Sequence, residues 1–202
     1  MRTNLAFALG WAAVVLRFAG EWMFPGDGPF ALLVAQAALL AAGVAFLWRS
    51  LGSIFLRGGN HAAGIREGLL ALPIGLLLGA VTAYAASGAL DWLSPDRLAA
   101  PLVGNLLFTA IEEVEFRGFL LALLLRLGLR PSTAVGAQAL IHTLAHGGRV
   151  LGGYYISLLV TLVMTLWFGS ITLRSRSLWG AWIAHLSWNM AIVLPQAGAG
   201  LG

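Results

Sequence analysis

The stretch Ile111-Glu112-Glu113-Val114-Glu115-Phe116-Arg117-Gly118 places three carboxylates and one guanidinium inside an apolar run from Leu98 to Leu127. An ionised side chain at the centre of a membrane helix costs about 2.5–3.5 kcal/mol on insertion scales. A chain that keeps four such groups within six positions is predicted to use them. Two uses stay open on this stretch alone, namely chemistry and an ion-pair cluster that only locks helices together.

The helical period separates these charged residues into two faces. Glu113 and Arg117 are four residues apart, so they share a face and can pair. Glu112 points about 100° away from Glu113 and is not neutralised by that pair. It shares its side of the helix with Glu115 and Phe116 instead. We therefore expect Glu113 to be structural and Glu112 to be left free for chemistry.

The composition indicates a membrane protein. Of 202 residues, 59% are hydrophobic and only 10% are charged, whereas soluble proteins average near 25% charged. The fold class predicted is all-α, a polytopic membrane bundle forming one domain over residues 1–202, with its motif-bearing core at about 98–195. The net charge of +4 comes from arginine, which indicates topology and not nucleic-acid binding. The absence of cysteine excludes thiol catalysis, disulfides and Cys-type zinc sites.

Runs of about 20 apolar residues predict about seven transmembrane helices, or eight if the fourth segment breaks differently. That fourth segment is longer than one crossing needs, so we expect a break or bend near Gly118, with Phe119 to Leu127 lying partly along the interface. The first run contains Arg17 and Glu21, which can pair, and is interpreted as an uncleaved helix. The predicted spans are 4–24, 30–48, 67–90, 98–127, 132–146, 150–173 and 178–194.

The connections between these spans are short or polar. A tight turn is predicted at 25–29, and a loop at 91–97 whose Ser94-Pro95-Asp96 is typical of a helix start. The segment 49–66 is too polar to span a membrane and is expected to hold at most a short surface helix. The first three spans carry no motif that indicates a function.

The arginines predict the orientation in the membrane. If Arg2 is cytoplasmic, the opposite side holds only Arg97 and Arg149, together with acidic residues. This asymmetry follows the positive-inside rule, so we expect a cell-membrane protein with a cytoplasmic N-terminus. The other arginines on the cytoplasmic side would be Arg49, Arg57, Arg66, Arg126, Arg130, Arg174 and Arg176.

Two further polar clusters lie on predicted membrane helices. His142 and His146 are four residues apart on the fifth helix, as are His185 and Asn189 on the seventh. Together with Glu112 they are the parts of a hydrolytic site. A carboxylate can take a proton from water, an imidazole can orient that water, and a second imidazole and an amide can hold an oxyanion.

Other interpretations of these groups stay open. Intramembrane His and Asn often form hydrogen bonds between helices, and this is the favoured interpretation for His142. The spacing of His142 and His146 also suits a metal, for which Glu112 and His185 could complete the ligand shell. There is no evident Ser-His-Asp arrangement, no HExxH and no paired-aspartate intramembrane motif.

Three motifs in order resemble one known family. The run Glu112–Arg117 fits EExxxR, His142-xxx-His146 is similar to FxxxH with His142 in the Phe position, and His185-xxx-Asn189 fits HxxxN. These are the motifs of the CPBP family, the CAAX-protease and bacteriocin-processing intramembrane proteins. The resemblance covers roughly half of the chain, from the fourth span to the C-terminus.

The resemblance implies a glutamate-dependent intramembrane endopeptidase. Glu112 would activate water with His146, and His185 and Asn189 would stabilise the oxyanion. The predicted limits of the helices place His146 near one helix end and Glu112 well inside another, which would separate them in depth by several ångströms. Tilt, or a start of the fourth helix near Pro101, would remove that difference.

The resemblance also assigns Glu113 and Arg117 to positioning the helix, and it implies no metal and no cofactor. His142 departs from the family pattern, which keeps zinc as an alternative. The expected partners are the lipid bilayer and a protein or peptide substrate that enters between helices, because the loops are too short to bind a large folded substrate. The alternatives are a non-catalytic scaffold or bacteriocin-immunity factor, and a transporter or proton relay.

Overall fold

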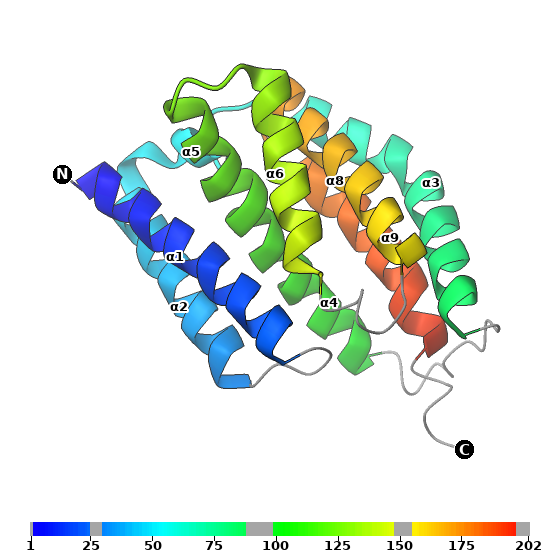
Figure 1. Cartoon of the computed structure of the whole chain (residues 1–202). Helices are drawn as coiled ribbons and strands as arrows, with labels where there is room; N and C mark the ends of the chain where they lie inside the picture. Colours follow the sequence, from blue (N-terminus) through cyan, green and yellow to red (C-terminus); the bar gives the residue numbers. More distant parts are fainter. Residues whose placement is uncertain (1, 25–29, 88–98, 148–154, 197–202) are drawn as a thin grey trace.

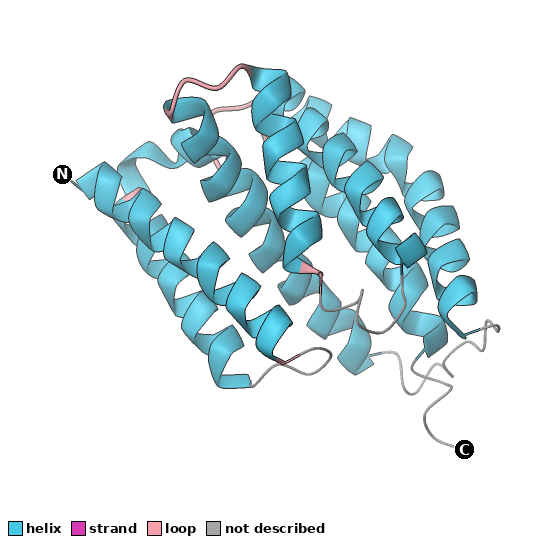
Figure 2. Cartoon of the chain, viewed as in Figure 1, coloured by secondary structure: helices cyan, strands magenta, loops and turns pink. Residues whose placement is uncertain are grey.

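The computed structural model describes residues 2–24, 30–87, 99–147 and 155–196. Within these ranges the chain forms helices joined by short loops and contains no strand (Figure 2). The all-α prediction is therefore confirmed for the described residues. The turn predicted at 25–29 and the loop predicted at 91–97 lie outside them.

The helices follow one another along the chain with short connections. α1 and α2 lie together on one side of the bundle, α3, α8 and α9 on the other, with α4, α5 and α6 between them (Figure 1). The bounds are α1 Arg2–Met23, α2 Phe30–Phe46, the 3-10 helix η1 Trp48–Ile54, α3 His61–Ser87, α4 Ala99–Glu112, the π-helix η3 Glu113–Leu120, α5 Leu121–Arg126, α6 Pro131–Ala145, α8 Tyr155–Ser175 and α9 Trp179–Gln196.

Three of these helices are long and apolar enough to cross a membrane, namely α1, α3 and α8. A fourth span results if α2 and η1, which meet at 110°, are counted together. The predicted number of seven or eight spans is thus not confirmed. One reason is that α6 has 15 residues and does not reach the roughly 20 residues of a membrane crossing.

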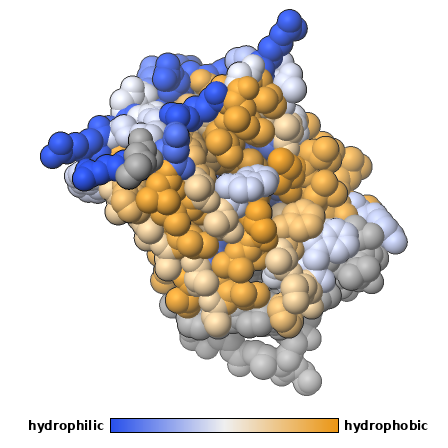
Figure 3. Space-filling view, turned by 60° about the vertical axis from the view of Figure 1, so that its left-hand side comes forward, coloured by the Kyte–Doolittle hydropathy of each residue, from blue (hydrophilic) through white to orange (hydrophobic). Residues whose placement is uncertain are grey.

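The surface of the bundle is largely apolar. Figure 3 shows a broad hydrophobic area across one face, with hydrophilic side chains gathered at one end. Leu70 and Leu77 of α3 are 68% and 64% exposed, and Leu159 of α8 is 64% exposed. Apolar side chains exposed on this scale fit a lipid environment better than water.

Arginine-bearing segments meet at one end of the bundle. Arg126, at the end of α5, donates to Asn4 at the start of α1 over 3.4 Å. Arg174, near the end of α8, pairs with Glu67 near the start of α3. These segments lie at the same end of the molecule in Figure 1. Arg97 and Arg149 lie outside the described residues, and the compartment that this end faces remains a prediction.

The predicted break near Gly118 is wrong. The chain stays helical from Ala99 to Arg126, with η3 as its middle section, and Gly118 is buried within that section. Phe119 packs into a notch where a Cβ on Gly10 of α1 or Gly43 of α2 would collide with its ring. The segment after Gly118 is therefore buried at its start, from Phe119 to Ala122, and exposed at its end, at Arg126 and Leu127. A π-helical section in a longer helix is rare and frequently marks a functional site.

Glycines bring α3 and α9 into close contact. A Cβ on Gly68, Gly75 or Gly79 of α3 would overlap atoms of α9. Small residues at this spacing let two helix backbones approach closely in a membrane. α3 thereby sets the position of α9, which carries His185.

The third helix begins earlier than predicted. It starts at His61 and not at Glu67, because the side chain of Asn60 accepts a hydrogen bond from the backbone N–H of Ala63 over 3.0 Å and caps the first turn. The short surface helix expected in the segment 49–66 corresponds to η1.

Candidate active site

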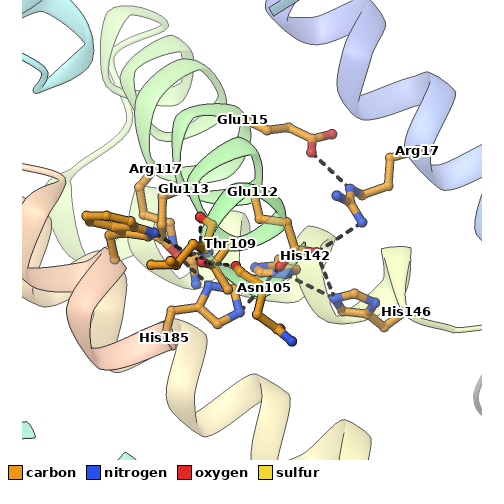
Figure 4. Close-up of polar contacts among 12 residues, drawn as sticks. Arg17, Asn105, Thr109, Glu112, Glu113, Glu115, Arg117, His142, His146 and His185 are labelled. Carbon is orange, nitrogen blue, oxygen red and sulfur yellow. Dashed lines mark hydrogen bonds and ion pairs between the residues drawn. The ribbon is translucent and has the colours of Figure 1, made fainter. Parts of the chain in front are cut away.

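Charged and imidazole side chains from four parts of the chain meet in the interior of the bundle (Figure 4). All but one are less than 9% exposed, and the exception, Glu21, is half-buried. They are Arg17 and Glu21 from α1; Glu112, Glu113, Glu115 and Arg117 from the α4–η3 junction; His142 and His146 from the end of α6; and His185 from α9.

Glu112 lies at the centre of this group and is 1% exposed. Its Oε1 atom is 3.7 Å from His146 Nε2, and its Oε2 atom is 3.3 Å from His185 Nε2. The expected difference in depth between Glu112 and His146 is therefore absent. His146 follows the end of α6 directly, and this end lies beside the α4–η3 junction, where Glu112 is the last residue of α4.

Glu113 and Arg117 form the ion pair that their spacing predicts, with 3.0 Å between Glu113 Oε1 and Arg117 Nη1. The same carboxylate oxygen is 2.7 Å from His185 Nδ1. Glu113 thus links α9 to η3, a contact that helical spacing cannot reveal. The rings of Phe168 and Trp188 stack on the imidazole at 5.3 and 5.8 Å between centroids and limit its rotation.

The expectation that Glu112 is left without a counter-charge is wrong. Arg17 Nη1 of α1 lies 3.0 Å from Glu112 Oε1, and Arg17 Nε donates to Glu115 Oε2 over 2.9 Å. Gln36 of α2 donates to the same Glu115 oxygen over 2.6 Å. Arg17 also lies 3.7 Å from Glu21, as its spacing predicts.

Arg17 is the functional-site residue that sequence reasoning missed. A buried guanidinium inside an apolar helix was the available signal, but its spacing pointed only to Glu21. The first two helices therefore do contribute to the site, although neither carries a motif. α1 supplies the charge of Arg17, which lies 95 residues before Glu112 in the sequence, and α2 supplies the hydrogen bond from Gln36 to Glu115.

His142 lies inside the site and not at its edge. Its ring is fully buried and stacks on Phe116, with 4.0 Å between centroids and 2° between planes. Its Nε2 atom is 3.2 Å from His146 Nε2. The nitrogen and oxygen ligand atoms of Glu112, His142 and His146 all lie within 4.8 Å of one another, which is close enough to hold one metal ion.

Asn189 is the one predicted site residue that the described contacts do not connect to the others. It lies on α9 one turn after His185 and is half-buried. Among the described residues no hydrogen bond to Glu112, His146 or His185 is found for it. The structure therefore brings together Glu112, Glu113, Arg117, His142, His146 and His185, and leaves Asn189 beside them.

An apolar cavity of about 550 Å³ lies between α2 and α4, next to the site. Its lining includes Ile111, which precedes Glu112, and Phe108, whose ring faces the Arg17 guanidinium at 4.9 Å. Asn105 is the polar side chain in a lining that otherwise consists of Leu33, Val34, Ala37, Pro101, Gly104, Leu107, Phe108 and Ile111.

Comparison with known families gives one match. Residues 95–191 match the model of the type II CAAX prenyl endopeptidase, Rce1-like family. The match covers just under half of the chain and agrees with the resemblance to the CPBP family. The matched segment contains all three motifs and every site residue except Arg17 and Glu21 of α1 and Gln36 of α2. No curated protein and no solved structure matches the chain.

Similarity to the Rce1-like family implies a CAAX-type intramembrane protease. The helices that are long and apolar enough to cross a membrane agree with that class. The protein is accordingly a membrane protein of a hydrolase family, and its buried carboxylates and imidazoles lie in the segment that defines the family.

Proposed function

We propose that the protein is an intramembrane endopeptidase that hydrolyses a peptide bond near the membrane end of a protein or peptide substrate, with Glu112 as the general base. One observation carries this proposal. Glu112 faces two imidazoles, His146 at 3.7 Å and His185 at 3.3 Å, within a buried site in the segment shared with the family.

The first step is the activation of water by Glu112 and His146. The 3.7 Å between Glu112 Oε1 and His146 Nε2 is too long for a direct hydrogen bond, but one water can bridge the two atoms. The water oxygen bonds to the substrate carbonyl carbon while Glu112 takes a proton. General-base catalysis of this kind contributes about 10²–10⁴-fold to a rate.

The second step is stabilisation and collapse of the tetrahedral intermediate. His185 Nε2–H and the Asn189 amide donate to the oxyanion. Because His185 Nδ1 donates to Glu113, the ring has an Nε2–H only when both nitrogens carry protons, so this role requires an imidazolium. The carbon–nitrogen bond then breaks, and the leaving amine takes the proton held by Glu112.

Glu113 and Arg117 are positioning residues in this proposal. Their ion pair holds η3, and Glu113 also holds the His185 ring through Nδ1. The guanidinium of Arg117 lies over the Phe168 ring at 5.2 Å, which connects the pair to α8. Neither residue is proposed to touch the substrate.

The substrate is proposed to reach the site from the bilayer through the apolar cavity between α2 and α4. The cavity suits a hydrophobic side chain or a lipid-modified segment, and Asn105 can offer hydrogen bonds to the peptide backbone. No nucleic acid, cofactor or metal takes part in the proposed reaction. The proposed location is the cell membrane, with a cytoplasmic N-terminus.

The test is cleavage of a tethered peptide library by purified protein in detergent with EDTA present. The library holds each peptide with and without a prenyl group. Wild-type protein is expected to cleave, Glu112→Gln to lose about 10²–10⁴-fold in rate, and His146→Ala to lose activity as well. Glu67→Gln is the matched control, because Glu67 pairs with an arginine far from the site.

Two results would contradict the proposal. Cleavage that EDTA abolishes and zinc restores would place Glu112, His146 and His185 in a metal shell. Cleavage by Glu112→Gln at the wild-type rate would remove the general-base role of Glu112.

A further inference from the structure

His142 gives this chain a pair of facing imidazoles that the FxxxH pattern lacks. His142 Nε2 and His146 Nε2 are 3.2 Å apart. Zinc–nitrogen bonds of about 2.0–2.1 Å at a tetrahedral angle place two ligand nitrogens about 3.3–3.4 Å apart. The two rings are therefore already spaced as two ligands of one tetrahedral metal ion.

Glu112 supplies a third ligand on the same side. Its Oε1 atom is 3.7 Å from His146 Nε2, and the ligand atoms of all three residues lie within 4.8 Å of one another. Each of the three residues is at most 5% exposed. Two imidazoles and one carboxylate with a fourth position open form a donor set that binds zinc in proteins.

The surroundings of the rings resemble the outer shell of a metal site. Glu21 Oε1 lies 3.9 Å from His146 Nδ1, so a carboxylate faces the nitrogen that would not bind the metal. Phe116 stacks on His142 and limits its rotation. A metal-binding imidazole usually donates the N–H of its second nitrogen to a group such as a carboxylate, and this raises the basicity of the imidazole as a ligand.

The charge of the cluster also accommodates a cation. Three buried carboxylates, Glu112, Glu113 and Glu115, face two guanidiniums, Arg17 and Arg117. When all five are ionised, one negative charge is left over, to which the half-buried Glu21 adds. Arg17 Nη1 contacts the Oε1 atom of Glu112, so it opposes the metal without occupying every lone pair of that oxygen.

We propose that Glu112, His142 and His146 bind one divalent transition-metal ion of the zinc type, and that the bound ion inhibits the protease. Inhibition follows because the ion takes the lone pairs of Glu112 and His146 that activate water. The proposed metal binding does not depend on the proposed function, whereas the inhibition rests on the function proposed above.

The test of binding uses cobalt(II), whose visible absorption reports four-coordinate geometry, added to tag-free, EDTA-treated and desalted protein in detergent. Wild-type protein is expected to bind one equivalent with that absorption. His142→Phe, which places an aromatic ring on Phe116, is expected to weaken binding by at least about tenfold, the scale on which even outer-shell changes act. His61→Gln is the matched control, since His61 hydrogen-bonds to Ser177 outside the site.

Thermal unfolding provides a second measurement that does not depend on one variant. A ligand that binds only the folded protein raises its melting temperature. Cobalt or zinc is expected to raise the melting temperature of the wild type and of His61→Gln. The increase is expected to be much smaller for His142→Phe and His142→Gln. The absence of stoichiometric binding by the wild type, or equal binding by His142→Phe, would overturn the proposed site.

The inhibition is measured as cleavage against zinc concentration, relative to the metal-free rate of each protein. The zinc concentration that halves the rate is expected to be at least about tenfold higher for His142→Phe than for the wild type. Zinc that binds without lowering the rate would overturn the inhibition. Failure of the function proposed above shows separately, as no cleavage in EDTA while the cobalt absorption persists.

Discussion

Two arginine–glutamate contacts join distant helices in this protein, and they differ in burial. Arg174 of α8 lies 2.6 Å from Glu67 of α3, and the two side chains are 57% and 31% exposed. Arg17 of α1 lies 3.0 Å from Glu112 and 2.9 Å from Glu115, and all three side chains are at most 3% exposed. The shorter contact is therefore the exposed one.

Burial, and not distance, decides how much each contact contributes to the free energy of unfolding. An exposed pair contributes about 0–1 kcal/mol, because solvent screens it and holding two long side chains costs entropy. Removal of one partner from a buried pair costs about 3–5 kcal/mol, because an uncompensated charge remains inside the protein. Three substitutions test this difference.

The largest effect is expected for Arg17→Met, which breaks the buried cluster at its shared cation. Glu112 and Glu115 lose their common counter-charge, so we expect the free energy of unfolding to fall by about 3–5 kcal/mol and cleavage to be lost. Unfolding in detergent and the cleavage assay measure the two effects. A variant as stable as the wild type would show that the carboxylates do not depend on Arg17.

An intermediate effect is expected for Trp22→Phe. Trp22 Nε1 donates to the carbonyl of Leu144 over 2.9 Å and joins α1 to the end of α6, next to His146. The loss of this single hydrogen bond at an exposed position is expected to cost about 0.5–1.5 kcal/mol. The same unfolding measurement checks it. A loss equal to that of Arg17→Met would mean that this contact, and not the charge cluster, holds α1 in place.

The smallest effect is expected for Arg174→Met, which breaks the exposed pair. We expect a change below about 1 kcal/mol in the free energy of unfolding and an unchanged cleavage rate. A decrease of several kcal/mol in the free energy of unfolding would show that solvent screens the Glu67 contact far less than its exposure indicates. Burial would then not explain the difference between the two contacts.

Short spacings in the sequence predicted the parts of the site that lie on one helix. The Glu113–Arg117 pair and the shared position of His142 and His146 follow from residues four apart on a helix, and the structure shows both contacts. The membrane character and the helical fold follow from apolar runs in the same way. These predictions succeed because the α-helix itself fixes which neighbours meet.

Predictions from residue spacing and apolar runs failed where the helix changed to π geometry or where a side chain capped a helix. The π-helix η3 replaces the expected break near Gly118, because buried packing of Phe119 in the notch of Gly10 and Gly43 keeps the segment inside the bundle. Asn60 likewise extends α3 beyond the apolar run by capping its first turn. Neither packing nor a cap of this kind can be recognised from hydrophobicity alone.

The sequence by itself determined the helical fold class, the three motifs and the resemblance to one family. Only the tertiary structure decided that Arg17 compensates Glu112, that Glu113 orients His185, and that the side chains of His142 and His146 lie close to Glu112. The physical reason is that a buried charge requires a counter-charge wherever the packed helices can bring one. Periodicity along one helix carries no information about which other helix supplies it.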